Sequence, residues 1–124
     1  MSDENAGKLN ELNAAELNAL LTAGKAVVID VREPAEYGAE RIPGALLFPL
    51  STFDPARLPL DTEKQVVFHC GGGGRSKRAA TSLFAHGIAE SSHLAGGIRG
   101  WKAAGFPVIA LDPLTGKPVE TRSA

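Results

Sequence analysis

The chain of 124 residues contains one cysteine, Cys70, and no long hydrophobic run. A single cysteine cannot form a disulfide within the chain, a CxxC redox pair or a zinc site built from several cysteines. A small secreted fold held together by disulfides is therefore excluded. We expect the protein to work in a compartment that keeps thiols reduced, and predict a cytoplasmic location.

An excess of charge of either sign is also missing. The 13 Lys and Arg residues against 14 Asp and Glu give a formal net charge of -1, which leaves no electrostatic footprint for DNA or RNA. No apolar run approaches the roughly 18 residues of a membrane span. The first residues lack the basic and then apolar order of a secretory signal. We expect no nucleic-acid partner and no membrane partner.

What the chain does have is enough apolar residues, 44%, for one globular domain with a hydrophobic core. Asn13 followed by Glu16 predicts a capping box at the start of a helix, which Gly24 ends. Residues 27–31 and 66–69 are short, apolar on both faces and rich in β-branched side chains, as in buried parallel strands. Weaker patterns predict strands at 45–47 and 92–94 and helices at 34–37, 76–86 and 98–104. This alternation predicts an α/β fold with a mainly parallel central sheet flanked by helices.

The two ends of the chain are polar. We expect residues 1–9 to be a flexible N-terminus and residues 10–111 to form the domain. Residues 112–124 contain two prolines and little apolar content, so they are expected to be a loose C-terminal tail.

The segment from Cys70 to Ser76 is the most informative in the chain. It follows a predicted strand at the end where α/β sheets bind ligands, and it contains four consecutive glycines. Such a run costs backbone entropy, which suits a tight loop whose N–H groups point inward and form an anion cradle with the next helix. The cradle would hold the Cys70 thiolate. We expect the loop amides, the helix dipole and Arg75 to lower the thiol pKa below its free value of about 8.5.

Several other chemistries do not fit this loop. The three histidines have no metal-ligand spacing, so neither a metal nor another cofactor is expected. The glycines match neither a P-loop nor a dinucleotide fingerprint. A Cys–His hydrolase would need His69, but neighbours on a strand point to opposite faces. Lys77 and Arg78 oppose the dipole of the predicted helix, which hints that an anion arrives there. Transfer of a phosphoryl group or of sulfane sulfur remains open.

Three blocks together resemble the single-domain rhodanese (thiosulfate sulfurtransferase) family, over about residues 12–108. They are DVRE with EY and IPGA within residues 30–45, CGGGGRS at 70–76, and LAGGI with GW and GFPV within 94–108. The resemblance implies a rhodanese-like three-layer domain. One departure is Arg41, which stands where many relatives have histidine.

The resemblance implies an enzyme in which Cys70 takes the outer sulfur of thiosulfate or a related small anionic donor, and passes it from a persulfide to cyanide or a thiol. A protein thiol is also a conceivable acceptor. The loop, with four residues between Cys70 and Arg75, has the length that goes with sulfur transfer, one residue shorter than in the related phosphatases. The residues implied in substrate binding are Gly71, Gly72, Gly73, Gly74, Arg75 and Ser76.

Some alternatives stay open at this point. The protein could be a sulfur carrier or sensor that hands its persulfide to a partner, or, less in keeping with the loop length, a phosphatase-like enzyme. Arg75 could bind the donor anion or brace the loop. Ser76 could cap the helix or donate its hydroxyl to the persulfide, and Arg32 could pair with Glu36.

Overall fold

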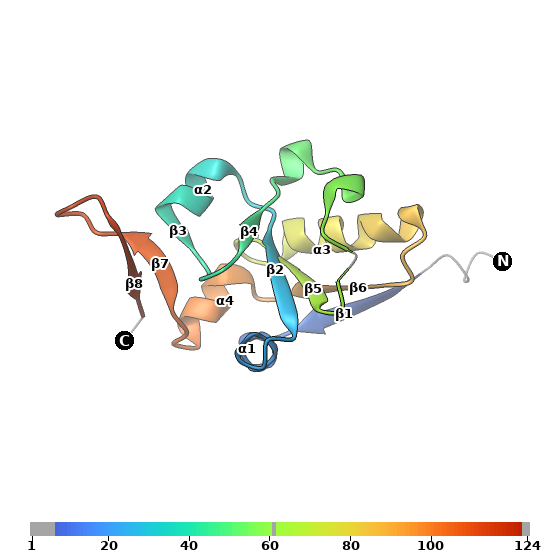
Figure 1. Cartoon of the computed structure of the whole chain (residues 1–124), viewed down its shortest axis with the longest axis horizontal. Helices are drawn as coiled ribbons and strands as arrows, with labels where there is room; N and C mark the ends of the chain where they lie inside the picture. Colours follow the sequence, from blue (N-terminus) through green and yellow to red (C-terminus); the bar gives the residue numbers. More distant parts are fainter. Residues whose placement is uncertain (1–6, 61, 123–124) are drawn as a thin grey trace.

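The computed structural model describes residues 7–60 and 62–122, and a five-stranded sheet lies at its centre (Figure 1). All neighbouring strands are parallel, in the order β1-β6-β5-β2-β4. Their bounds are β1 (Lys8–Leu12), β2 (Ala26–Asp30), β4 (Leu46–Leu47), β5 (Gln65–His69) and β6 (Glu90–Leu94). The predicted α/β class with a parallel central sheet is therefore confirmed.

Helices cover both faces of this sheet (Figure 1). They are α1 (Ala14–Thr22), α2 (Pro34–Ala39), α3 (Gly74–Ser82) and α4 (Gly97–Ala103), with 3-10 turns at Leu50–Thr52, Pro55–Arg57 and Leu83–His86. Val28 and Val67 face the core beneath α1 and α4, whereas their neighbours Ile29 and Phe68 face the core beneath α3. The central strands are apolar at consecutive positions because both of their faces are covered.

The start of the chain differs from the expectation. The structure places Lys8 and Leu9 in β1, an edge strand that pairs in parallel with β6, so the prediction of a flexible segment up to residue 9 is wrong for these two residues. An edge strand can be largely polar, because backbone hydrogen bonds to its neighbour hold it in the sheet. The sequence of β1 therefore lacks the apolar pattern by which a buried strand is recognised. Residues 1–6 of that predicted segment lie outside the described residues.

The predicted loose tail also differs. A second, antiparallel sheet has the order β3-β7-β8 and joins β3 (Glu40–Arg41), β7 (Val108–Leu111) and β8 (Pro118–Thr121). All four residues of β8 are exposed, so the pairing depends on backbone hydrogen bonds and leaves no apolar pattern in the sequence. Residues 118–121 are therefore part of a hairpin, which the prediction missed.

The helix after the glycines begins earlier than predicted. Gly73 is its N-cap, with a φ of 116°, and α3 starts at Gly74 rather than at Ser76. Of the described residues, none belongs to a helix long and apolar enough to cross a membrane.

Candidate active site

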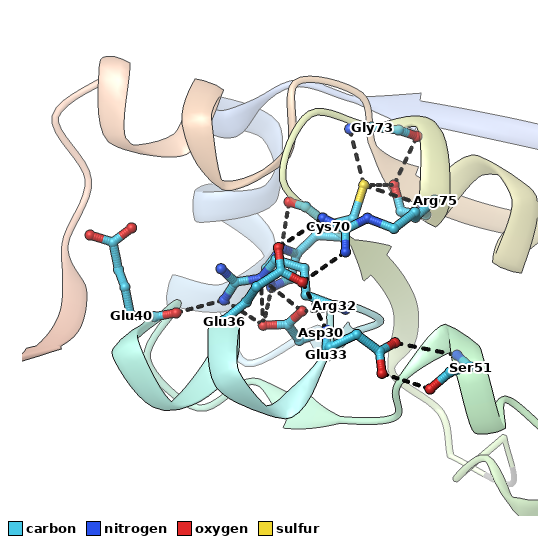
Figure 2. A network of polar contacts seen from close by, with 11 residues as sticks. Asp30, Arg32, Glu33, Glu36, Glu40, Ser51, Cys70, Gly73 and Arg75 are labelled. Carbon is cyan, nitrogen blue, oxygen red and sulfur yellow. Dashed lines mark hydrogen bonds and ion pairs between the residues drawn. The ribbon is translucent and has the colours of Figure 1, made fainter.

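The Cys70 sulfur accepts hydrogen bonds from two backbone amides of the loop. Cys70 follows the last residue of β5, and the Gly73 and Ser76 N–H groups donate to its Sγ across 3.1 and 3.4 Å. Figure 2 shows the sulfur pointing toward Gly73. The inward orientation of amides that the glycine run predicts is therefore present at these two positions.

These contacts stabilise the charged form of the sulfur. Burial by itself would raise the pKa of the Cys70 thiol, but the amides of Ser76, Gly73 and Gly72 and the Ser76 hydroxyl outweigh it and lower the pKa below its ordinary value. The residue is 1% exposed. The loop and the groups packed around it therefore cover the sulfur.

Close packing requires one glycine of the loop, Gly73, whereas at Gly72 a Cβ would only displace the flexible end of the Arg99 side chain. A Cβ at Gly73 would collide with the carbonyl oxygen of Ala95, and the positive φ of Gly73 disfavours any side chain. Gly74, the first residue of α3, has open space around its Cα. The glycines of this loop therefore allow it to pack closely against the segment from Ala95 to Arg99.

The start of α4 holds the outer side of the loop. The Ile98 N–H donates to the Cys70 carbonyl at 2.8 Å, and the Arg99 N–H donates to the Gly71 carbonyl at 3.2 Å. With these carbonyls bound to α4, the following N–H groups face the sulfur. The position of Gly71 in the site is therefore set by its carbonyl, and no contact joins Gly71 to the sulfur.

Arg75 is held by Glu36 and also interacts with Cys70, which adds to the rise in the pKa of the guanidinium. Its guanidinium forms a bidentate pair with Glu36, with Nη1–Oε1 at 2.8 Å and Nη2–Oε2 at 2.9 Å (Figure 2). The Arg75 hydrogen bonds lower the pKa of Glu36 to about 2, and Glu36 in turn raises the pKa of Arg75. Of the two roles left open for Arg75, this geometry supports the one that braces the loop, by tying α3 to α2.

Arg32 has a different partner from the one suggested by the sequence. It pairs with Asp30, at 2.8 Å between Nη2 and Oδ2, instead of Glu36, and also donates to the Glu40 carbonyl. His69 Nε2 lies 3.4 Å from the same Asp30 oxygen. Burial would raise the pKa of Asp30, but His69 and Arg32 together hold it well below its ordinary value. Asp30, Arg32 and His69 therefore form a buried cluster that contains charged groups, next to the start of the loop.

Ser76 is in the first turn of α3 and does not cap it. Its side chain is fully buried, and its Oγ lies 3.7 Å from the Cys70 sulfur. The alternative in which the hydroxyl faces the sulfur is therefore the one that the structure favours. Lys77 and Arg78 follow on the exposed surface of the same helix.

Arg99 is a site residue that the sequence reasoning missed. Its exposed guanidinium lies over Gly72 and near Gly71. Within residues 7–60 and 62–122, Arg32 and Arg75 both pair with carboxylates and Arg99 with none. The only signal was its place in the GGIRGW block, and nothing in that block says which way the side chain points. Across the same described ranges, His, Cys, Asp and Glu side chains form no group of three or more suited to a metal ion.

Comparison with known proteins matches the Rhodanese-like domain to residues 13–104, well over half of the chain. A sulfurtransferase of Allochromatium vinosum is 31% identical over 103 residues, which is 82% of this chain and 96% of that protein. A tRNA uridine(34) hydroxylase of Erwinia tasmaniensis is 34% identical over 108 residues, or 78% of this chain and 31% of that protein. Several other curated relatives are also longer, and the chain spans less than two thirds of their length.

Solved structures that resemble this fold include a protein related to the same family. A rhodanese-related protein from Thermoplasma volcanium superimposes with a TM-score of 0.69 at 30% identity, covering 81% of this chain and 97% of that one.

Proposed function

The chain belongs to the rhodanese-like domain family, and from that premise we propose that it is a thiosulfate sulfurtransferase working through a persulfide on Cys70. Membership confirms the resemblance that the three sequence blocks indicate. One observation carries the proposal beyond the family: the Gly73 and Ser76 amides donate to the Cys70 sulfur and favour its anionic form. A thiolate stabilised in this way is a nucleophile.

The reaction proceeds in two displacements. The Cys70 thiolate attacks the outer sulfur of thiosulfate, a new S–S bond forms, and the S–S bond of thiosulfate breaks with its electron pair leaving on sulfite. Cyanide or a thiolate then attacks the terminal sulfur of the persulfide, and the Cys70 thiolate departs. The amides of residues 71–76 hold the negative terminal sulfur, and those of Gly73 and Ser76 already donate to the resting sulfur.

Arg99 supplies the positive charge for the donor. A donor such as thiosulfate carries two negative charges, and Arg99, whose guanidinium lies over Gly72, has no carboxylate partner among the described residues. A guanidinium presents several N–H donors in a fixed plane, which suits the oxygens of a sulfonate-like group. Arg75 keeps the loop in place through Glu36.

One observation favours a second function, that of a sulfur carrier. Cys70 is 1% exposed, and a persulfide covered to this degree would be protected from small thiols until a partner opened the loop. Turnover with free thiosulfate and cyanide separates the two functions. An enzyme produces thiocyanate over many cycles, whereas a carrier is loaded once and turns over only with its partner.

The direct test is mass spectrometry of the purified chain after exposure to thiosulfate. The expected result is a gain of one sulfur atom, removed by cyanide. Because the chain has a single cysteine, the added mass is assigned without ambiguity, and Cys70→Ala is the control. A wild-type chain that gains no sulfur under conditions that load a known sulfurtransferase would contradict both functions.

A further inference from the structure

A series of hydrogen-bonded polar groups leads from the Cys70 sulfur to the surface. Ser76 Oγ, 3.7 Å from the sulfur, lies 2.8 Å from His93 Nδ1. The other ring nitrogen of His93, Nε2, lies 3.0 Å from Glu11 Oε2. Ser76 and His93 are almost completely buried, whereas the Glu11 side chain is 51% exposed.

Three elements bring these groups together. Ser76 lies on α3, His93 on β6 and Glu11 on β1. Glu11 and His93 are opposite each other in the register of the parallel β1–β6 pair. Residues paired in register share a face of the sheet, so the carboxylate and the imidazole are neighbours by construction. The carboxylate ends at a groove of about 490 Å³ that Ala95, Gly96 and Gly97 also line.

The contacts among Cys70, Ser76, His93 and Glu11 are all satisfied by the following arrangement of protons. A carboxylate only accepts hydrogen bonds, so His93 carries its proton on Nε2 and donates it to Glu11. Nδ1 is then an acceptor for the Ser76 hydroxyl, and the Ser76 oxygen is free to accept from the Cys70 S–H. Once the thiol has ionised, the Ser76 hydroxyl donates to the Cys70 thiolate, which is one of the contacts that lower the thiol pKa.

Because the thiol is buried, these hydrogen-bonded groups can act in its deprotonation. With Cys70 1% exposed, the groups in contact with the sulfur are the first to receive the proton that the thiol must lose before it can act as a nucleophile. The order of groups, from nucleophile through hydroxyl and imidazole to carboxylate, is that of a nucleophile activated by a base that a third group orients.

We propose that Ser76, His93 and Glu11 form a relay that carries the Cys70 proton to the surface. The S–H bond breaks and its proton passes to Ser76 Oγ, while the original hydroxyl proton passes to His93 Nδ1. The products are a Cys70 thiolate and a His93 imidazolium, whose charge Glu11 balances. The Nε2 proton then leaves to water at the exposed carboxylate. This proposal rests on the proposed role of Cys70 as the nucleophile.

The charged groups around His93 are few. Among the residues that the structure describes, Glu11 faces it from β1, and Lys77 acts on Glu11 from α3; β5 places the apolar Phe68 beside it. The hydrogen bond with His93, followed by Lys77, lowers the pKa of Glu11. The carboxylate is therefore charged throughout the neutral range, as the relay requires.

The test is the pH profile of Cys70 alkylation by iodoacetamide, an uncharged reagent that reports thiolate. His93→Asn keeps a hydrogen-bond acceptor near the position of Nδ1 but cannot take up a proton. We expect its profile to move to higher pH and its alkylation rate at neutral pH to fall about tenfold, which corresponds to about one pKa unit. Glu11→Gln keeps an acceptor for Nε2 without the charge, and should move the profile in the same direction by less.

Matched controls are His86→Asn and Glu90→Gln, at exposed side chains outside the relay, and both should leave the profile unchanged. A folded His93→Asn chain with the wild-type profile would overturn the relay. If His93→Asn does not fold, an unchanged profile in Glu11→Gln, a substitution at the surface, overturns it instead. Alkylation does not require sulfur transfer, so a chain that shows these shifts but gains no sulfur from thiosulfate would contradict the proposed function alone.

Discussion

Arg75 and Glu36 are bound to each other through two hydrogen bonds of 2.8 and 2.9 Å, so the arginine of the loop is already neutralised before any substrate arrives. The pair joins the first turn of α3 to α2. The backbone amides of Ser76 and Gly73 are the strongest contributions that favour the anionic sulfur. We propose that Arg75 braces the loop and that Arg99 binds the donor.

The first prediction concerns acid stability. The pKa of Glu36 is lowered from 4.5 to about 2 in the folded state, so Glu36 contributes stability that is present above pH 4.5 and is lost as the pH falls toward 2. Since both partners are more than a third exposed, solvent screening keeps the contribution modest. We expect Glu36→Gln to be less stable than wild type at neutral pH and to have a weaker loss of stability in this acid range, measured by urea unfolding.

The control for this measurement is Glu63→Gln, at an exposed carboxylate. It should leave both the stability and its pH dependence unchanged. Wild-type and Glu36→Gln chains that lose stability in parallel between pH 4.5 and pH 2 would show that the pair does not act on folding.

A second prediction assigns Arg99 to donor binding. Removal of the guanidinium in Arg99→Ala should raise the KM for thiosulfate about tenfold, equivalent to about 1.4 kcal/mol. The rate at which cyanide unloads a persulfide formed beforehand should change much less, because the donor has already left. Steady-state and single-turnover kinetics measure the two quantities separately. Arg57→Ala, at an exposed arginine paired with Asp54, is the control, and an equal rise in KM in both variants would count against the assignment.

The sequence predicts the centre of this site because its signals are local. The glycine run, the strand before it and the helix after it are neighbours along the chain, so the amides around Cys70 follow from one segment. The capping box of Asn13 and Glu16 is local in the same way, and it is present as predicted, with both hydrogen bonds at 2.8 Å.

The rest of the site could not be predicted because it joins distant segments. Glu36 and Arg75 are 39 residues apart, and Glu11 and His93 are 82 residues apart. Their meeting depends on which strands are neighbours in the sheet, and β1 itself was missed. Arg32 pairs with Asp30 because both are buried at the end of β2, where an unpaired charge would be costly, and burial of two charged residues has no pattern in the sequence.

A third prediction tests the geometry of the loop. In Gly73→Ala the new Cβ would collide with the Ala95 carbonyl oxygen. The φ of 116° at this position is also one that only glycine adopts readily. The Gly73 amide would move away from the sulfur, and we expect sulfur loading from thiosulfate to be lost and alkylation of Cys70 to require higher pH. Gly38→Ala, in α2 with open space around it and no positive φ, is the matched control and should keep full activity. A Gly73→Ala chain with normal kinetics would contradict the role given to the amides.

The last prediction separates sulfur transfer from phosphate chemistry at the same cysteine. Serine in Cys70→Ser can still accept hydrogen bonds from the Gly73 and Ser76 amides, so the loop should fold as before and the melting temperature should change little. A hydroxyl does not ionise near neutral pH and forms no persulfide, so thiocyanate production should fall to the rate without protein. The wild-type chain should not hydrolyse an aryl phosphate above that background. If it does, and Cys70→Ser abolishes the hydrolysis, the phosphatase-like alternative replaces sulfur transfer as the function of this loop.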